Sequence, residues 1–469
     1  MTGWRSKSAD ESAEGLAAGP ADRAPERAVE PAHGAAEEAP PAAATARPVP
    51  AGRVVRGRLA PPPSKSLTHR YLVLALLAGR PLALIDPLDA KDTRLLLAAL
   101  EALGWRVERR PGEVVLEPPG ATAPRSAAID CGNAGTMLRL LIGALATVPG
   151  TWRLDGTPRL RERPVGPLVA ALRDLGAEIA WEGRPGYPPL TVRGGRLPGG
   201  RTRLDAGESS QYLSALLIAA HAAAAPVTIE VAALASAPYV EITLAALARF
   251  GGGAERPAPD RFHVSPDALA GPTRLRVEGD FSAACYPAAA AALTGGRVTL
   301  EGLDADSPQG DRGFLELLER LGARMTWSEG GVTVEGTGEL RAVDADLGAM
   351  PDQVPTLAAL APFARGTTRI RGVPHLRLKE SDRLAAMAAE LGRLGATVEE
   401  RPDGLVIPGR WADAEPPAFP VTVDPHDDHR IAMSLALTAL RRPGVSIARP
   451  EVVAKSYPGF WRDLTNLVG

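Results

Sequence analysis

Apolar and polar positions along the chain follow a pattern that repeats about every 73 residues. A segment with apolar residues at helical spacing ends in Leu-Gly or Phe-Gly, and a strand-like stretch follows, as in "LEALGWRV" and "LRDLGAEI". Glycine at this place predicts the left-handed residue that ends a helix. The glycines are Gly104, Gly176, Gly251, Gly322 and Gly395, and one further period reaches Gly469. The pattern predicts six units of one design.

Each unit also contains a second predicted helix that consists almost entirely of Ala and Leu, for example "YLVLALLAG" and "MLRLLIGALAT". A helix that is apolar on every side is expected to be buried, whereas the helices that end in Leu-Gly have one polar face. Six units of strands, one inner helix and one outer helix predict an α/β protein with two domains of three units each.

Polar residues recur where the inner helices begin, in "SKSLTHR", "CGNAGT", "GESSQ", "EGDFSAA", "MPDQ" and "DPHDDHR". Helix N-termini have unpaired N–H groups and a partial positive charge, so they attract anions. Ordinary capping explains the Ser and Asp residues. It does not explain Lys65, Arg70, Gln211 or Arg430, and lysine is rare in this chain. The helix starts therefore predict an anion-binding site.

Composition excludes several classes of protein. A net charge of −2 and 4% aromatic residues argue against nucleic acid as a partner, and no long uninterrupted apolar run predicts a membrane span. Cys131 and Cys285 form no disulfide framework, which favours a reducing, cytoplasmic location. The Ala-, Pro- and Glu-rich residues 1–50 cannot bury enough apolar surface to fold, so they are expected to be a disordered tail.

Three further segments are unusually polar. The loop "GTPRLRERP" contains Arg159, Arg161 and Arg163, whose planar guanidinium groups suit carboxylate or phosphate. A solvated charged loop explains it equally well. "HLRLKESDRL" places Lys379, Glu380 and Arg383 together, and "VVAKSYPGFW" contains Lys455. A surface ion pair is the ordinary explanation for Glu380 and Arg383. Lys91 is expected to be a surface residue at the start of an outer helix.

Nine motifs in order resemble those of the 3-phosphoshikimate 1-carboxyvinyltransferase (EPSP synthase) family of enolpyruvyl transferases. They are "SKSLTHR", "GNAGTMLR", "GTPRLRERP", "SSQYLSALL", "APYVEITL", "MPDQVPTLA", "HLRLKESDRL", "DDHRIAMSLAL" and "KSYPGFW". The resemblance implies a two-domain inside-out α/β barrel with three βαβαββ repeats per domain and buried inner helices. One domain would comprise residues 64–278, and the second residues 51–63 together with 279–469.

The resemblance also implies an activity: transfer of the enolpyruvyl group of phosphoenolpyruvate to the 5-hydroxyl of shikimate 3-phosphate, with release of phosphate. It implies no metal or organic cofactor, no partner other than these two substrates, and a monomer. The positions that match family residues for shikimate 3-phosphate are Lys65, Ser66, Arg70, Ser209, Ser210, Gln211, Ser236, Asp352 and Lys379, with Tyr239 in the same site. Those that match residues for phosphoenolpyruvate are Lys65, Asn133, Gly135, Arg159, Gln211, Arg383, Arg430 and Lys455.

Three residues are the candidates for catalysis. Glu380 would protonate the methylene of phosphoenolpyruvate, Asp352 would take the proton of the 5-hydroxyl, and Lys65 could also pass a proton. The cations near Glu380 would lower its pKa, whereas burial and substrate phosphate would raise it, so the sequence leaves the sum open. We also expect two basic halves to repel each other across the cleft until anions bridge them.

Three alternatives remain. A transferase that acts on UDP-N-acetylglucosamine has the same fold, but it uses a cysteine in the loop that here reads "GTPRLRERP". A noncatalytic anion-binding scaffold would not need Asp352 and Glu380. A metal site in "HDDH", residues 426–429, would bring four ligands from adjacent positions to one ion, which is rare. His429 is better explained as a residue that orients Arg430, and His69 and His375 as cleft walls.

Overall fold

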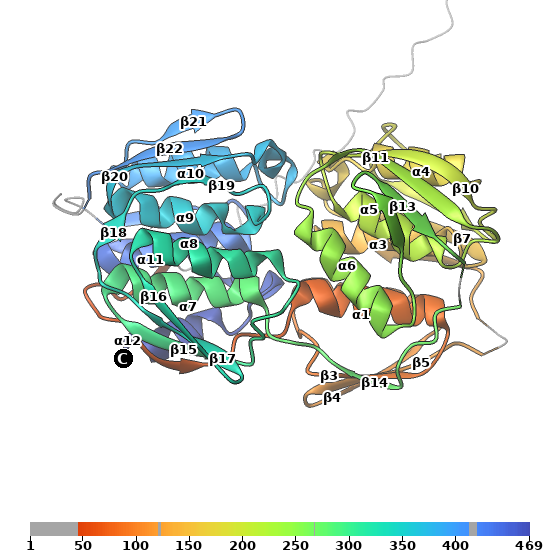
Figure 1. Cartoon of the computed structure of the whole chain (residues 1–469), viewed down its shortest axis with the longest axis horizontal. Helices are drawn as coiled ribbons and strands as arrows, with labels where there is room; N and C mark the ends of the chain where they lie inside the picture. Colours follow the sequence, from red (N-terminus) through yellow and green to blue (C-terminus); the bar gives the residue numbers. More distant parts are fainter. Residues whose placement is uncertain (1–45, 121–122, 267, 412–419) are drawn as a thin grey trace, which may run out of the picture. The chain divides into compact units, whose positions relative to one another are not determined.

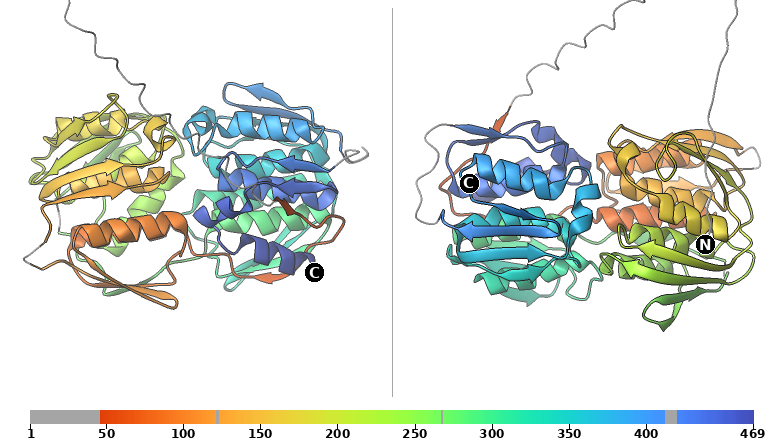
Figure 2. Two further views of the ribbon diagram at one scale, coloured as in Figure 1. Left: turned by 180° about the vertical axis from the view of Figure 1, so that it is seen from behind. Right: turned by 90° about the horizontal axis from the view of Figure 1, so that it is seen from above.

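The structure, a computed structural model, describes residues 46–120, 123–266, 268–411 and 420–469. Ala44–Gly469 forms one compact unit with two hydrophobic cores. The first core uses side chains between Leu67 and Val277, and the second uses side chains between Val49 and Val468. We call the parts around these cores the first and second lobes (Figures 1 and 2).

The first lobe contains three units, each with one inner and one outer helix. The first unit has α1 (Lys65–Ala78), β3 (Leu82–Ile85), α2 (Lys91–Ala102), β4 (Arg106–Arg110) and β5 (Glu113–Glu117). The second has β6 (Ser126–Asp130), α3 (Gly135–Leu145), β7 (Gly150–Asp155), α4 (Gly166–Asp174), β8 (Glu178–Trp181) and β9 (Leu190–Gly194). The third has β10 (Gly200–Ala206), α5 (Gln211–Ala220), β11 (Val227–Leu234), α6 (Pro238–Arg249), β12 (Glu255–Ala258) and β13 (Arg261–Val264).

The second lobe repeats this arrangement. Its first unit has α7 (Phe281–Thr294), β15 (Arg297–Glu301), α8 (Gly313–Leu321), β16 (Arg324–Ser328) and β17 (Gly331–Glu335). The next has β18 (Leu340–Arg341), β19 (Asp344–Asp346), α9 (Val354–Leu360), β20 (Ala364–Arg371), α10 (Arg383–Arg393), β21 (Glu399–Arg401) and β22 (Gly404–Gly409). The last has β23 (Val421–Val423), α11 (His429–Arg441), β24 (Val445–Ile447) and α12 (Phe460–Val468).

The six predicted units are confirmed, and so is their internal order. Within a complete unit the first strand pairs in parallel with the second, which then pairs antiparallel with a hairpin, as in the order β6-β7-β9-β8. The predicted glycine stops are also confirmed, because all six glycines of the repeat have positive φ, between 76° and 112°. The inner helices are buried along almost their whole length.

Two strands are exchanged between the lobes, which the repeat pattern by itself does not indicate, although the family resemblance assigns residues 51–63 to the second domain. β2 (Arg56–Leu59) pairs in parallel with β15 in the second lobe. β14 (Arg274–Arg276) pairs in parallel with β3 in the first lobe. β2 takes the first-strand position in the unit that contains α7. β14 takes the first-strand position in the unit that contains α1. The chain therefore passes between the lobes twice, just before α1 and just before α7.

The prediction of a tail up to residue 50 is wrong for its last residues. β1 (Arg47–Pro48) pairs antiparallel with β24, in the place that a hairpin occupies in the other units. Val49 is buried, and its N–H donates to the Val445 carbonyl. An open sheet edge satisfies the backbone groups of this short segment despite its composition. The rest of the predicted tail, residues 1–45, lies outside the described residues.

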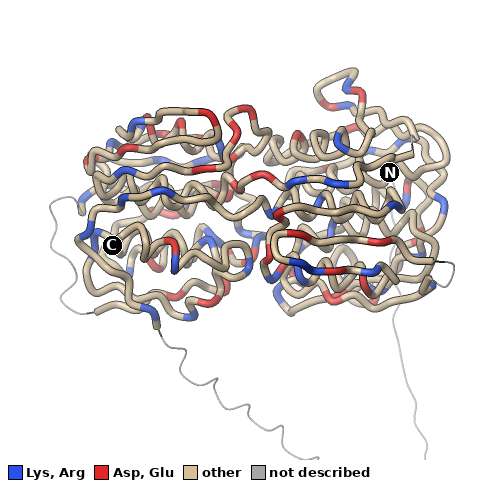
Figure 3. Tube along the Cα trace, turned by 90° about the horizontal axis from the view of Figure 1, so that it is seen from below, with Lys and Arg blue, Asp and Glu red and all other residues tan. Residues whose placement is uncertain are grey.

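The distribution of charge and the hydropathy of the helices agree with what the composition indicated about nucleic acid and membrane spans. In Figure 3 short positive and negative segments are interspersed along the mostly uncharged trace of both lobes, rather than forming long stretches of one sign. Among the described residues no helix is both long and apolar enough to cross a membrane. Cys131 and Cys285 are buried free thiols.

Candidate active site

A polar cavity lies where the two lobes meet. Residues from the starts of five of the six inner helices line it, in keeping with the predicted anion site. The lining residues are Lys65, Ser66, Thr136, Arg163, Ser209, Ser210, Gln211, Ser236, Tyr239, Pro351, Asp352, Lys379, Glu380, Arg383 and Arg430. Five of these are cations and two are carboxylates, which leaves a surplus of three positive charges.

Local capping fixes where these helices begin. The Ser64 hydroxyl accepts the Leu67 N–H at the start of α1, and the Asp428 carboxylate accepts the Arg430 N–H at the start of α11. The sixth inner helix, α7, has no residue in the cavity lining. Its cap Asp280 instead accepts the Lys65 backbone N–H at 2.9 Å, which joins the lobes behind the cavity.

Asp352 is held by three donors. The Arg383 Nη1 lies 2.7 Å from one carboxylate oxygen, and the Arg430 Nη2 lies 2.6 Å from the other. The Tyr239 hydroxyl, from the first lobe, donates to the same carboxylate at 3.0 Å. Burial opposes ionisation of Asp352, but Arg430 and Arg383 outweigh it and hold its pKa well below the ordinary value. Asp352 is therefore a carboxylate in this arrangement.

Glu380 is a carboxylate as well. Burial raises its pKa, but Arg163, Lys455 and Arg383 together hold that pKa well below its usual range. The Arg383 Nη2 donates to Glu380 at 3.0 Å, and Lys455 and Arg163 each have a nitrogen 3.7 Å from its other oxygen. The sequence left open whether burial or the nearby cations dominate the pKa of Glu380. In the structure the cations dominate, because three of them surround this one carboxylate.

Lys379 is the cavity cation with the lowest pKa that the structure gives. Burial, partly offset by Asp352, brings the pKa of its ammonium from 10.5 to about 7. Nearby, the Ser236 hydroxyl lies 3.2 Å from the His375 Nε2. Ser236 has φ of +53°, a costly conformation for a residue with a side chain. Burial lowers the pKa of His375 to about 3, so this imidazole is neutral.

The first-lobe wall is built from short hydroxyls and one amide. Ser209 and Ser210 are buried just before α5. The amide of Gln211 donates to the Thr136 hydroxyl at 2.8 Å and accepts from Arg139 at 2.9 Å. These two hydrogen bonds fix the orientation of the Gln211 amide.

Arg70 and Gly135, both predicted ligand residues, lie behind this wall. The Arg70 guanidinium is buried and donates to Thr243, Ser214 and the carbonyls of Ser66 and Tyr239. It therefore braces two parts of the wall. A Cβ atom on Gly135 would lie 2.5 Å from a nitrogen of Arg163, so glycine is required for that arginine to approach α3.

Asn133, Arg159 and Lys455 line an adjoining hollow that shares Glu380 with the cavity. Arg159 donates to the backbone carbonyls of 377, 379 and 380, so it links the first lobe to the second. The Lys455 Nζ donates to the Asn133 carbonyl at 2.7 Å, also between lobes. The expectation that the two halves repel each other does not account for this structure, because opposite charges and hydrogen bonds join them.

Sequence reasoning missed Arg163 as a site residue. It comes from the same loop as Arg159, but it lies in the cavity wall and is buried, whereas Arg159 lines the adjoining hollow and donates to backbone carbonyls of the second lobe. Its Nη1 donates to the Asn133 carbonyl at 3.1 Å, and its Nε has no hydrogen-bond partner among the described residues. The third arginine of "GTPRLRERP" was visible in the sequence, but nothing there distinguished it from the other two.

The residues of "HDDH" contact different partners. His426 contacts Glu390, Asp427 pairs with Arg449, and Asp428 pairs with Arg383. His429 is fully buried beside the cavity, and burial holds its pKa well below the ordinary value. His69 is also buried, and its pKa falls to about 3. Lys91 is exposed at the start of α2, as predicted.

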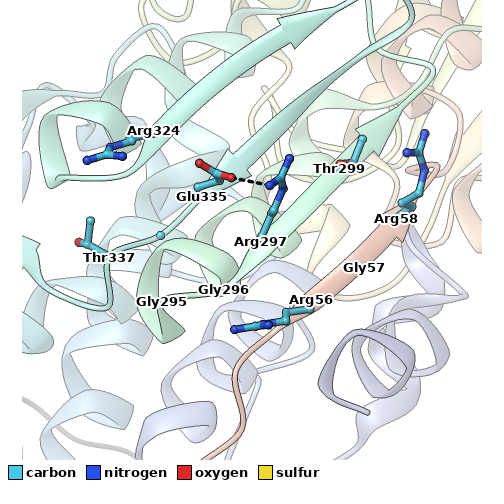
Figure 4. Close-up of a pocket in the computed structure, with 11 residues that line it drawn as sticks. Arg56, Gly57, Arg58, Gly295, Gly296, Arg297, Thr299, Arg324, Glu335 and Thr337 are labelled. Atoms are coloured by element: carbon cyan, nitrogen blue, oxygen red, sulfur yellow. Dashed lines mark ion pairs between the residues drawn. The ribbon is translucent and has the colours of Figure 1, made fainter.

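A second arginine-rich hollow lies on the outer sheet of the second lobe (Figure 4). Arg56 stands directly beside Arg297, and Arg297 pairs with Glu335 at 2.9 Å. These side chains are exposed, on the solvent face of a sheet rather than at an inner helix start. We therefore do not assign the chemistry to this hollow.

Comparisons with known proteins place the chain in a family. The model of the family EPSP synthase (3-phosphoshikimate 1-carboxyvinyltransferase) matches residues 49–464. The chain belongs to the EPSP synthase family. It is 48% identical over 416 residues to a 3-phosphoshikimate 1-carboxyvinyltransferase of Syntrophobacter fumaroxidans, covering 88% of this chain and 97% of that protein. It is 42% identical over 430 residues to one of Bordetella pertussis, covering 88% and 96%.

Solved structures of the family share the fold. An EPSP synthase from Acinetobacter baumannii superposes with a TM-score of 0.73 at 29% identity, covering 90% of this chain and 98% of that one. The enolpyruvyl transferase NikO from Streptomyces tendae has the same TM-score at 20% identity, covering 91% and 98%. The second likeness concerns the fold alone. The predicted two-domain inside-out α/β fold with six repeats is therefore confirmed for this member of the EPSP synthase family.

Proposed function

We propose that this enzyme transfers the enolpyruvyl group of phosphoenolpyruvate to the 5-hydroxyl of shikimate 3-phosphate, releasing inorganic phosphate. Membership of the family supports this reaction. The observation that carries it is the cavity itself, which combines five cations with two buried carboxylates. Both substrates are small polyanions, so the surplus of positive charge would attract them, and the carboxylates supply the groups that move protons.

Two parts of the cavity suit the two substrates. Short hydroxyls, Gln211 and Lys379 on one side would hold the hydroxyls and the phosphate of shikimate 3-phosphate. Arg383, Arg430 and Arg163 on the other side, with Lys455 at the edge, would hold phosphoenolpyruvate. Lys65 lies at the start of α1 between these parts. We add Arg163 to the predicted binding residues, and we assign Arg159, Arg70 and Gly135 roles in positioning the wall.

Asp352 would act as the base for the 5-hydroxyl. It cannot accept a proton readily while Arg383 and Arg430 both hold it. The carboxylate of phosphoenolpyruvate is a competing partner for those two arginines. Its arrival would weaken their hold on Asp352 and raise the pKa of that carboxyl. In this scheme the base becomes effective only when the second substrate is in place.

Glu380 and Lys65 would handle the methylene proton. The 5-hydroxyl oxygen forms a bond to C2 of phosphoenolpyruvate, C3 gains a proton, and a tetrahedral intermediate results. Breaking the C2–O bond to phosphate and removing a proton from C3 then restores the double bond. Because Glu380 is ionised, it suits the second step, and Lys65 suits the first. Phosphate near Lys455 and Arg163 would also draw these cations from Glu380, which raises the pKa of its carboxyl and makes the carboxylate a better acceptor for the C3 proton.

Three further features belong to the proposal. We propose that residues 64–278 form one enolpyruvyl transferase domain and that residues 51–63 with 279–469 form the other; the strand exchange of β2 and β14 supports these bounds. We propose a monomer, which is what the family resemblance implies. We propose a cytoplasmic location, in keeping with two free thiols.

Phosphate release from phosphoenolpyruvate tests the function. The purified chain is assayed with shikimate 3-phosphate and, separately, with UDP-N-acetylglucosamine. We expect release only with shikimate 3-phosphate, together with an enolpyruvyl product detectable by mass spectrometry. Release with only the sugar nucleotide would overturn the proposal. An Arg58→Gln variant, altered in the outer hollow of Figure 4, which shares no lining residue with the cavity, is the matched control and should keep its activity.

A further inference from the structure

One buried carboxylate beside the site has no role in the scheme above. Asp92 lies in the first turn of α2, and its side chain is 5% exposed. Its carboxylate oxygens lie 3.7 Å from the Lys65 Nζ and 3.4 Å from the Lys455 Nζ. Lys65 belongs to α1 in the first lobe, and Lys455 ends a 3-10 helix in the second lobe, Pro450–Lys455. Asp92 therefore contacts an ammonium group from each lobe.

Ordinary helix chemistry does not explain this position. An acidic residue in the first turn complements the helix dipole, but it can do so while remaining in water. A buried carboxylate loses its hydration, which is costly unless charges of opposite sign replace the water. Among the described residues, Lys65 and Lys455 are the cations within ion-pair distance of Asp92. Its burial is therefore explained by these two contacts.

The two lysines also need Asp92. Both carry positive charge in a cavity that already has an excess of it, so they repel each other and the neighbouring arginines. Lys455 has a second carboxylate, Glu380, at 3.7 Å, and it donates to the Asn133 carbonyl. For Lys65, Asp92 is the one side-chain carboxylate within ion-pair distance among the described residues. Without Asp92, Lys65 would face the cations unopposed.

We propose that Asp92 is a positioning residue that holds Lys65 and Lys455 beside each other across the two lobes, so that both ammonium groups meet the phosphate of phosphoenolpyruvate. The inference rests on the proposed function. Asp92 touches no reacting atom; it acts through the two lysines. The opposite effect is also physically conceivable: if Asp92 merely repelled anions, its removal would strengthen the binding of phosphoenolpyruvate. The two hypotheses predict changes of opposite sign in the KM for phosphoenolpyruvate when Asp92 is neutralised.

The test is the neutral, nearly isosteric variant Asp92→Asn. With shikimate 3-phosphate saturating, we expect the KM for phosphoenolpyruvate to rise about tenfold, because the removal of one buried charge partner leaves the other cations uncompensated. kcat should fall by a smaller factor than KM rises, because no reacting group is removed, although Lys65, the proposed donor to C3, loses its carboxylate partner. The dissociation constant of shikimate 3-phosphate, measured calorimetrically, should change little, since most of its predicted contacts are remote from Asp92.

Two further variants make the result specific. Asp89→Asn removes an acid three residues earlier that is 73% exposed and pairs with Arg94, so its kinetics should match the wild type. Asp92→Glu keeps the charge with one more methylene and should recover part of the lost affinity, which a purely steric effect would not allow. If Asp92→Asn does not fold, Asp92→Ser, which is smaller and also neutral, is assayed with the same expected shift.

The possible outcomes distinguish a failure of the role of Asp92 from a failure of the proposed function. An unchanged or lowered KM for phosphoenolpyruvate in the neutral variant would overturn the role of Asp92, provided that the wild type turns over shikimate 3-phosphate. Equal losses in the Asp92 and Asp89 variants would overturn it as well. If the wild type itself releases no phosphate with shikimate 3-phosphate, the proposed function fails, and that result is read before any variant is compared.

Discussion

The pKa of Lys379 makes the affinity for shikimate 3-phosphate depend on pH. Burial, partly offset by Asp352, brings that pKa to about 7. An anion that binds beside the ammonium stabilises its protonated form, so binding raises the pKa and takes up a proton above pH 7. The sign follows directly: affinity falls as pH rises through 7.

The size of the effect follows from the titration alone. With a pKa of about 7, the charged fraction of Lys379 falls from about one half at pH 7 to about 3% at pH 8.5. If only the ammonium form binds, the dissociation constant should rise roughly 16-fold over this interval. Phosphate esters lose their second proton near pH 6, so the ligand stays largely dianionic throughout. His375 and Asp311, with pKa values of about 3 and about 6, change little there.

Isothermal titration calorimetry from pH 7 to 8.5 measures this directly. Repeating each titration in two buffers of different ionisation enthalpy gives the number of protons taken up, which should approach one at pH 8.5. In the variant Lys379→Met the affinity should be lower and nearly independent of pH. A flat wild-type profile, or a slope that persists in Lys379→Met, would refute the assignment of this pKa to Lys379.

Four other substitutions have defined outcomes. Gly135→Ala would put a methyl group 2.5 Å from Arg163 and displace it, so steady-state assays should show a KM for phosphoenolpyruvate raised about tenfold. Asp352→Asn keeps the volume but removes the base, so kcat should fall by about 10² to 10⁴ while calorimetry still detects shikimate 3-phosphate; full activity would exclude Asp352 as the base. Gly409→Ala places a Cβ 1.6 Å from a backbone oxygen, so the free energy of unfolding measured in urea should fall by at least about 2 kcal/mol. Gly392 lies within helix α10, and a Cβ there would have no neighbouring atom within 4 Å. Gly392→Ala should therefore raise the same free energy by up to about 1 kcal/mol.

Local chemistry allowed the repeats to be predicted. A glycine that ends a helix, an amphipathic helix and a wholly apolar helix are properties of neighbouring residues, so they are visible at each of the six periods. The same holds for the polar helix starts, because residues such as Lys65 and Arg430 break the capping pattern locally. The cavity that collects these starts was therefore expected, and the structure places both residues in its wall.

Choices between similar residues could not be predicted. Arg159 and Arg163 stand in one loop with the same side chain, and only the packing of the loop against α3 puts Arg163 in the cavity and Arg159 on backbone carbonyls. Asp92 follows Lys91 at the predicted start of an outer helix, and nothing in the sequence distinguished it. Its contact with Lys455 joins residues 363 positions apart in sequence, which no local pattern reports.

The sequence alone determined the six units, the inner and outer helices and an anion-binding role for the inner helix starts, because each depends on short-range periodicity and on residue type. The tertiary structure decided which strands cross between the lobes, which cations share the cavity, and that Glu380 and Asp352 are ionised there. These depend on distances between groups remote in sequence, and Coulomb interactions and burial take their values only from those distances.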